Sequence, residues 1–352
     1  MRVLIVRLSA MGDIIHAMPA VSAMRQLWPE AHLGWAIEER WLPLLTSRSR
    51  DDLQGPAGPE QPLVDQIHII NFKQWRRRPF SSATMREVIA AHRELKAQHY
   101  DAAIDLQGAV RSAVLAKTSG ARLVIGEARP REYPASWWFD QKVTTRGEHV
   151  IEQAHEVISA LLDHRPPIAR PEFPRDRLAE QWAAGFLGGN LRRPARQYAI
   201  LNPGAGWGAK CWPAERYGVV ARTLAEQGTE CLVNVGPGEN GLGREVVARS
   251  NGSAAMVECS LPQLIALTRG AALFIGGDTG PMHLASALQV PVVGIFGPTD
   301  PKRNGPFNSP SVILRHPESK RDHSRRSEPE QGLLTITIEE VVEAALGLLG
   351  RK

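Results

Sequence analysis

The fold is decided by a stretch in the second half of the chain, Phe274-Ile275-Gly276-Gly277-Asp278-Thr279-Gly280-Pro281-Met282-His283-Leu284-Ala285-Ser286-Ala287. Its apolar start predicts a buried strand, and the acid, hydroxyl and glycine that follow predict a turn that opens a helix. Pro281 fits the first helical position, where its missing N–H costs nothing, and Thr279-Gly280 before it leaves backbone N–H groups pointing outward. Such a helix start can bind a phosphate, while Asp278 and His283 suit a sugar hydroxyl beside a nucleotide.

Two other interpretations of this stretch have to be weighed. Asp-Thr-Gly also begins the active loop of aspartic proteases, but those enzymes need a second carboxylate loop on a β-rich chain. Here the triplet is followed by Pro-Met-His-Leu-Ala-Ser-Ala, a helical run. The remaining alternative is a plain strand-to-helix turn with a capping residue.

The amino terminus, residues 1–20, predicts a second strand, glycine-containing turn and helix, so that two clefts can face each other. In both halves of the chain, strand-like runs alternate with amphipathic helical runs, which predicts parallel sheets covered by helices. The expected strands are 3–6, 32–37, 67–70, 102–104 and 122–125 in the first half and 198–201, 231–235, 273–275 and 290–296 in the second. Helices are expected to begin near Pro213, Leu242, Leu261 and Pro281.

A length of 352 residues favours two domains. The proline-rich stretch His164–Pro171 predicts the linker, so we expect domains at 1–168 and 169–352. Residues 46–62 are rich in Ser, Pro, Gly and charge and predict a mobile surface loop. Residues 338–350 predict a terminal amphipathic helix.

Composition narrows the functional class. A formal net charge of +5 with a pI near 9.3 indicates an anionic partner, and nucleic acid, a nucleotide sugar or a phosphorylated lipid surface all remain open. The three cysteines, Cys211, Cys231 and Cys259, have no CxxC spacing and predict reduced thiols in a cytoplasmic protein. We expect neither a secretory signal nor a membrane span, so that any membrane contact is peripheral.

The loop Asn202–Pro213 is open to several interpretations. It matches GxGxxA after a strand, with Glu230 further on, which admits a dinucleotide-binding oxidoreductase. It nearly matches a Walker A loop, but Ala209 and Cys211 replace residues that an NTPase needs. Lys210 on this loop suits a departing pyrophosphate, and a solvated lysine is the alternative.

The residues now support a resemblance to a known family. Arg-Leu-Ser-Ala-Met-Gly-Asp-Ile-Ile-His at residues 7–16, Gly-Asp-Thr-Gly-Pro-Met-His at 277–283 and Gly-Pro-Thr-Asp-Pro at 297–301 match, in order and spacing, the bacterial ADP-heptose:lipopolysaccharide heptosyltransferases. The resemblance covers nearly the whole chain, and residues 12–20 are more similar to the heptosyltransferase I branch than to heptosyltransferase II. It implies an α/β fold of the GT-B type, two Rossmann-like domains facing a central cleft, with an N-terminal acceptor domain and a C-terminal donor domain. In such proteins the terminal helix commonly packs back on the first domain.

The resemblance also implies site residues. Lys210, in a matching Lys-x-Trp-Pro spacing, would bind the diphosphate, and Glu239 would bind the ribose; an exposed turn acid is the alternative for Glu239. Asp278, Thr279, Gly280 and His283 complete the expected donor set. The chain departs from relatives that carry Ser or Thr earlier in the loop, since it has Ala205 and Gly206, so backbone N–H groups must replace those hydroxyls. For Asp300, binding and turn capping are equally open.

On the first domain, the resemblance assigns the catalytic base to Asp13, with a helix N-cap before Ile14 as the alternative role. The segment Asp-x-Gln-Gly at 105–108 matches the family, and Asp105 is either an acceptor residue or structural. The expected acceptor-binding residues are Arg7, Ser9, Asp105, Gln107, Arg111 and Arg131, with solvated arginines as the alternative reading.

Two further segments are rich in aromatic residues, and the first of them is also strongly basic. Residues 73–80, Lys-Gln-Trp-Arg-Arg-Arg-Pro-Phe, resemble both RNA-binding and membrane-surface segments, and we favour an inner-leaflet or lipid A phosphate contact. Trp137-Trp138-Phe139 are either core or an interfacial anchor, and we favour the core.

The resulting hypothesis is an inverting glycosyltransferase without metal or cofactor that moves L-glycero-D-manno-heptose from ADP-heptose to Kdo of the lipopolysaccharide inner core. No Asp-x-Asp triplet occurs, so Lys210 and a helix end would replace the usual metal clamp. We expect a cytoplasmic monomer, peripheral to the inner membrane, whose partners are ADP-heptose and Kdo-lipid A rather than nucleic acid. The alternatives are a heptosyltransferase II-like enzyme with another acceptor, an NAD-dependent oxidoreductase and a catalytically idle basic binding protein.

Overall fold

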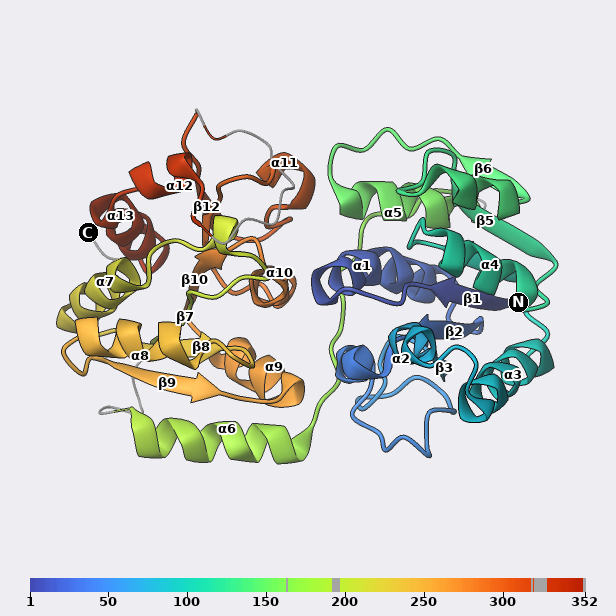
Figure 1. The fold of residues 1–352 in the computed structure, drawn as a ribbon, viewed down its shortest axis with the longest axis horizontal. Helices are drawn as coiled ribbons and strands as arrows, with labels where there is room; N and C mark the ends of the chain where they lie inside the picture. Colours follow the sequence, from blue (N-terminus) through green and yellow to red (C-terminus); the bar gives the residue numbers. More distant parts are fainter. Residues whose placement is uncertain (163, 192–196, 318, 320–327, 351–352) are drawn as a thin grey trace. The chain divides into compact units, whose positions relative to one another are not determined.

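The computed structural model describes residues 1–162, 164–191, 197–317, 319 and 328–350 (Figure 1). The chain divides into two compact units, Met1–Arg175 and Asp176–Lys352. The division falls a few residues after the expected boundary at 168, in an extended segment that also holds the prolines of 164–171. Prolines suit such a segment because they lack the N–H that a helix or a central strand requires.

The first unit is built on one parallel sheet of six strands in the order β3-β2-β1-β4-β5-β6. The strands are β1 (Arg2–Val6), β2 (His32–Ile37), β3 (Gln66–Ile69), β4 (Ala102–Asp105), β5 (Leu123–Glu127) and β6 (Gln141–Val143). The helical segments are α1 (Met11–Leu27), η1 (Glu39–Leu44), α2 (Phe72–Arg77), α3 (Ser82–Ala97), α4 (Val110–Thr118), η2 (Tyr133–Trp138) and α5 (Val150–Ser159).

The central strands β1 and β4 are apolar apart from Arg2 at the start of β1 and Asp105 at the end of β4, as expected for strands covered on both faces. Residues from α2, α3, α4 and η2 share one buried cluster with side chains of β1, β2, β4 and β5. The helices α1 and α5 pack against each other, and α1 buries twelve of its residues. The carboxyl ends of β1 and β4, the two central strands, are therefore held rigidly.

The second unit repeats this topology. Its parallel sheet has the order β12-β11-β10-β7-β8-β9, which is the same winding as in the first unit. The strands are β7 (Tyr198–Asn202), β8 (Glu230–Val235), β9 (Ala254–Glu258), β10 (Leu273–Gly277), β11 (Val292–Ile295) and β12 (Ser311–Leu314). The helical segments are α6 (Arg177–Asn190), η3 (Gly208–Lys210), α7 (Ala214–Glu226), α8 (Asn240–Arg249), α9 (Leu261–Gly270), α10 (Gly280–Ala287), α11 (Pro301–Asn304), α12 (Gln331–Thr335) and α13 (Ile338–Leu348).

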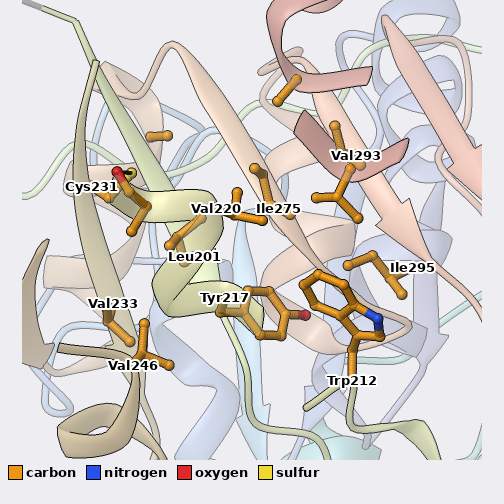
Figure 2. Close-up of a cluster of buried hydrophobic side chains, with 14 of the residues drawn as sticks. Leu201, Trp212, Tyr217, Val220, Cys231, Val233, Val246, Ile275, Val293 and Ile295 are labelled. Atoms are coloured by element: carbon orange, nitrogen blue, oxygen red, sulfur yellow. Dashed lines mark hydrogen bonds between the residues drawn. The ribbon is translucent and has the colours of Figure 1, made fainter. Parts of the chain in front are cut away.

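Two buried clusters cover the two faces of this sheet. One joins α7, α8, α12 and α13 to β7, β8, β10 and β11, and Figure 2 shows its centre, where Trp212 and Tyr217 lie near Ile275, Val293 and Ile295. The other joins α6, α9 and α10 to the opposite face. The strand and helix alternation of the sequence thus gives two α/β units with Rossmann-type strand order.

Three strands were missed by the sequence pattern, β6, β9 and β12, and all three lie at sheet edges. Edge strands are partly exposed, so they lack the continuous apolar run that marks the central strands. β6, with the sequence Gln-Lys-Val, has no fully buried residue, and β12 is exposed or half-buried throughout.

Several local expectations are corrected. The buried residues of the last helix, Val341 and Ala345, belong to the core of the second unit, and its packing on the first domain stays a prediction. The segment 137–139 was expected in the core, yet Trp137 and Trp138 are 72% and 39% exposed and Phe139 alone is buried. The loop 46–62 is anchored by buried Leu53 and Gln61 and is not wholly a surface loop.

Within the part of the chain that the structure describes, no helix is both long enough and apolar enough to cross a membrane.

Candidate active site

In each sheet, two central strands are followed by connections that run in opposite directions, β1 and β4 in the first unit and β7 and β10 in the second. In sheets of this class, ligands bind at the carboxyl ends of such a strand pair. Most of the residues predicted from the sequence lie after these strands, whereas Glu239 follows β8 and Arg131 follows β5. Each unit therefore carries one cluster of candidate residues, which we call the donor half-site in the second unit and the acceptor half-site in the first.

The loop after β7 holds Lys210 through a buried anchor two residues further on. Trp212 is 1% exposed, its Nε1 donates to the Ile336 carbonyl at 3.1 Å, and its ring meets Tyr217 edge-on at 5.0 Å (Figure 2). The short helix η3 ends at Lys210, and the ammonium lies 5.0 Å from the centre of the Trp207 ring. The loop thus directs a lysine side chain from a fixed backbone.

Lys210 reaches the turn after β10. Its Nζ lies 2.6 Å from Oδ2 of Asp278 and 3.3 Å from the Asp278 carbonyl oxygen. The other carboxylate oxygen of Asp278 lies 3.1 Å from Nε2 of His283. The structure therefore brings three predicted donor residues together, although 73 residues separate the first from the last.

The charge state of Asp278 follows from these neighbours. Burial by itself raises the pKa of this carboxyl, but the hydrogen bond and charge of His283 together with the Lys210 ammonium hold its pKa well below the usual range. Asp278 is therefore ionised at neutral pH and balances the charge of Lys210.

The helix α10 begins directly after this carboxylate. Gly280 is its first residue and Pro281 its second, so Pro281 lies one position later than expected. The Thr279 side chain makes no capping hydrogen bond, and its buried Oγ1 has no partner among the described residues. An uncapped helix start beside a lysine and an unpaired hydroxyl suits a phosphate group, whose oxygens accept hydrogen bonds from all three.

Thr299 is a residue of the same kind that sequence reasoning missed. It follows β11, the neighbour of β10, is 3% exposed, and its Oγ1 has no hydrogen-bond partner within the described ranges. Its position in Gly-Pro-Thr-Asp-Pro was the available signal, but the sequence does not show which side chain of that turn is inward. The adjacent Asp300 accepts from the Lys302 N–H at 3.1 Å and caps α11, which supports its capping role.

Glu239 is held against the loop after β7 by two glycines. Its Oε2 accepts from the Gly236 N–H at 2.8 Å. A Cβ at Gly204 would lie 2.1 Å from the same oxygen, so only glycine leaves room for this carboxylate. The side-chain amide of Asn234 donates to Oδ1 of Asn202 at 2.7 Å, and the amide of Asn202 donates to the Gly204 carbonyl at 2.9 Å. These two hydrogen bonds fix the start of the loop after β7. Glu239, in the turn after β8, therefore packs against the loop that carries Lys210.

The oxidoreductase interpretation of this loop is not supported. In a dinucleotide-binding fold the glycine run opens directly into a helix, whose N-terminus receives the pyrophosphate. Here Gly204–Ala209 passes through η3, and α7 begins only at Ala214, with Pro213 as its N-cap rather than its first residue.

In the acceptor half-site, Arg7 and Asp13 form an ion pair at the carboxyl end of β1. Arg7 Nη2 lies 2.9 Å from Asp13 Oδ1, and Arg7 also donates to the Leu106 carbonyl after β4. The side chain of Asp13 is 44% exposed, so one face of the carboxylate is open to a ligand. Asp13 thus combines a fixed position with accessibility.

Asp13 is not the N-cap of the first helix, which was the alternative role expected for it. The helix α1 begins at Met11, with Ala10 as its N-cap, so Asp13 is the third helical residue and not the N-cap before Ile14. It still caps the helix, because its Oδ2 accepts from the Ala10 N–H at 3.0 Å. An acid at this position also suits the positive end of the helix dipole.

Asp105 and Gln107 are buried and organise the loops of this half-site. Asp105 accepts from the N–H groups of Gln107 and Gly108 at 2.7 and 2.9 Å and from the Ser112 hydroxyl at 2.9 Å. Gln107 Oε1 accepts from the N–H groups of Leu8 and Ser9 at 3.0 and 3.3 Å. Burial raises the pKa of Asp105 to about 6 in spite of its hydrogen bonds. At 2% exposure, Asp105 acts on the shape of the loop and has no surface for a ligand.

The two remaining arginines lie around the glycine turn after β4. Gly108 has a φ of +64°, and a Cβ there would lie 3.0 Å from the backbone nitrogen of Arg131. The turn therefore requires glycine, and the backbone at Arg131 packs directly against it. Arg111 is the second residue of α4, and the side chains of Arg111 and Arg131 are exposed. The structure thus brings Arg7, Ser9, Asp13, Asp105 and Gln107 together, with two exposed arginines at the same end of the sheet.

Among the described residues, no group of three or more His, Cys, Asp or Glu is placed to hold a metal ion.

Comparison with known proteins identifies what this arrangement is similar to. The sequence profile of glycosyltransferase family 9 (heptosyltransferase) matches residues 88–334. Lipopolysaccharide heptosyltransferase 1 of Escherichia coli K12 is 26% identical over 321 residues, which cover 90% of this chain and 94% of that protein.

Two solved structures of the E. coli heptosyltransferase WaaC have the same fold. The structure with ADP has a TM-score of 0.78 at 25% identity and covers 99% of this chain and all of that one. The structure with ADP-2-deoxy-2-fluoro heptose has a TM-score of 0.76 at 25% identity and covers 97% of this chain and 98% of that one. The fold is therefore that of the GT-B heptosyltransferases.

Proposed function

Because the chain belongs to glycosyltransferase family 9, the heptosyltransferases, we propose that it transfers L-glycero-D-manno-heptose from ADP-heptose to a Kdo residue of the lipopolysaccharide inner core. The similarity to lipopolysaccharide heptosyltransferase 1 and to WaaC bound to a fluorinated ADP-heptose supports this donor and this step. The observation that carries the proposal is the contact of Lys210 with Asp278 at the start of α10.

The donor half-site supplies what a nucleotide diphosphate sugar needs. The Lys210 ammonium and the N–H groups at the start of α10 neutralise the diphosphate as it leaves with the electrons of the anomeric C–O bond. The unpaired hydroxyl of Thr279 donates a further hydrogen bond. Asp278 and His283 form hydrogen bonds with hydroxyls of the sugar, and Glu239 binds the vicinal hydroxyls of the ribose.

The acceptor half-site supplies the base. The Asp13 carboxylate takes the proton from the acceptor hydroxyl while that oxygen forms the new bond to the anomeric carbon, from the side opposite to the leaving ADP. No covalent intermediate with the protein is formed, and the configuration at the anomeric carbon is inverted. Arg7 holds Asp13 in position, and Arg111 and Arg131 bind carboxylates or phosphates of the acceptor.

The acceptor is a lipid, so the proposal includes a place of action at the cytoplasmic surface of the inner membrane. The enzyme acts there as a peripheral protein and as a monomer. The positive net charge of +5 favours such an anionic surface.

One assay tests the proposal directly. The protein is incubated with ADP-heptose and Kdo-lipid A, and the lipid is analysed by mass spectrometry while ADP release is measured. We expect the lipid to gain one heptosyl residue in step with ADP. Transfer only to a lipid that already carries the first heptose would assign the chain to the heptosyltransferase II type. No transfer to either lipid would refute the proposal.

A further inference from the structure

The helix α3 is poorly covered by the rest of its unit. Of its 16 residues, only Thr84 and Leu95 are buried. Met85, Val88 and Ile89 are 55%, 37% and 42% exposed, and their spacing places them on one face of the helix. In the turn before the helix, Phe80 is 98% exposed. The described residues of the first unit thus leave this apolar stripe largely uncovered.

Residues 72–97, which form α2 and α3 and which we call the α2–α3 surface, are also strongly basic. They contain seven Lys and Arg against two Glu, so they carry five formal positive charges, as many as the net charge of the whole chain. Lys73, Arg76, Arg77, Arg78 and Arg86 are all exposed. The positive charge is thus concentrated beside the apolar stripe.

The two acidic residues of this surface are engaged by inward groups. Glu87 accepts from Nε1 of the buried Trp75 at 2.9 Å, which also ties α2 to α3. Glu94 lies 2.7 Å from Nδ1 of the buried His68 on β3. These contacts pair both carboxylates with groups of the protein, although the Glu94 side chain stays 46% exposed, and cations and apolar side chains outnumber them on the α2–α3 surface. Figure 1 shows α3 at the margin of the first unit.

We propose that the α2–α3 surface docks this protein on an anionic phospholipid bilayer. Phe80, Met85, Val88 and Ile89 enter the headgroup region, and the flanking lysine and arginine side chains bind lipid phosphates. A helix with an apolar face and basic flanks is the arrangement that lies in a membrane interface. Single-stranded RNA is disfavoured, because its bases need aromatic platforms and this stripe is mainly aliphatic. The proposal names the surface that serves the lipid acceptor, and to that extent it rests on the proposed function.

The test is flotation of the protein with vesicles that contain neither lipopolysaccharide precursors nor ADP-heptose. Vesicles of phosphatidylglycerol and phosphatidylcholine in equal parts are compared with vesicles of phosphatidylcholine alone. The wild type is expected to float with the anionic vesicles only and to be released by salt. The triple variant Arg76→Gln, Arg77→Gln, Arg78→Gln should bind on the order of 100-fold more weakly, since each basic residue near the surface contributes about fivefold. The double variant Met85→Asp, Ile89→Asp should lose flotation as well.

Matched controls come from the second unit. Leu178 on α6 is 78% exposed, so Leu178→Asp tests an apolar-to-acid change elsewhere. The triple variant Arg177→Gln, Arg244→Gln, Arg249→Gln removes three other exposed charges. Both controls should float like the wild type. Every variant is also assayed for heptose transfer to a de-acylated, water-soluble Kdo acceptor.

The outcomes separate this proposal from the proposed function. Lost flotation in both α2–α3 variants, with melting temperature and transfer to the soluble acceptor preserved, supports the docking surface. Wild-type flotation of either α2–α3 variant, equal loss in the controls, or binding of a single-stranded RNA oligonucleotide instead of vesicles overturns it. Absent heptose transfer in the wild type, with vesicle binding intact, would refute the function and leave the surface standing.

Discussion

The Nζ atom of Lys210 lies 2.6 Å from Oδ2 of Asp278, and the two side chains are 12% and 7% exposed. The cation that is expected to bind the diphosphate is thus already paired with a carboxylate at the start of α10. A bound diphosphate must share or replace this partner. Since His283 also bonds Asp278, the carboxylate keeps one partner when Lys210 turns to a phosphate.

Replacing Lys210 by alanine should weaken donor binding. A hydrogen bond to a charged group contributes about 1.5 to 3 kcal/mol, so Lys210→Ala is expected to reduce the affinity for ADP and ADP-heptose by that amount. Isothermal titration with ADP measures it. Lys302→Ala, which removes an exposed lysine of the same unit, serves as the control and should titrate like the wild type. Unchanged binding heat and affinity in Lys210→Ala would remove this lysine from the site.

Two glycines of one loop offer a matched pair of changes. Gly204→Ala places a methyl group within about 2 Å of the Glu239 carboxylate, which must move because it is the free end of a flexible side chain. Gly206→Ala meets no atom within 4 Å. We therefore expect Gly204→Ala to lower the affinity for ADP with little change in melting temperature, and Gly206→Ala to bind normally. Equal affinities in the two variants would show that Glu239 does not bind the nucleotide.

The ionised state of Asp278 predicts a pH dependence of stability. Its pKa is lowered in the folded protein, so its contribution is complete above the pKa of the unfolded chain and is lost as pH falls toward the folded value. The difference in melting temperature between the wild type and Asp278→Asn should therefore be constant above about pH 5 and shrink below about pH 4. A difference that stays constant down to about pH 3 would contradict the lowered pKa.

How far the sequence predicts this molecule depends on burial. The apolar central strands and the glycine turns after β7 and β10 were predictable, because a covered parallel strand has a continuous apolar run and a tight turn needs glycine. The edge strands β6, β9 and β12 were not, since partial exposure removes that signal. The starts of α7 and α10 differ by one residue from the prediction, which put Pro213 and Pro281 at the first helical position. Pro213 is the N-cap of α7 and Pro281 the second residue of α10, because proline fits several positions at the start of a helix.

The site was predictable in its members but not in its pairings. The sequence placed Asp278 and His283 at one helix start and Lys210 on another loop, and only the fold shows that the three form one hydrogen-bonded group. It left the role of Asp105 open, because burial and three local hydrogen bonds are tertiary facts. The unpaired hydroxyl of Thr299 was missed for the same reason.

The sequence has no Asp-x-Asp triplet, which predicts that transfer needs no divalent cation, and removal of metal tests this prediction. Because Lys210 and the start of α10 are expected to bind the diphosphate, heptose transfer should proceed at an essentially unchanged rate in excess EDTA. The measurement compares initial rates with and without the chelator. A rate that falls with EDTA and returns with magnesium would show that transfer depends on a divalent cation.

The central claim is that Asp13 accepts the proton of the attacking hydroxyl, and the turnover of Asp13→Asn tests it most directly. Asparagine can still accept the hydrogen bond from the Ala10 N–H, so the start of α1 is kept, but its amide cannot take up a proton. The account predicts that turnover with ADP-heptose and Kdo-lipid A falls by about 10²- to 10⁴-fold, while melting temperature and ADP affinity stay close to those of the wild type. Turnover at the wild-type rate in the folded Asp13→Asn variant would contradict it.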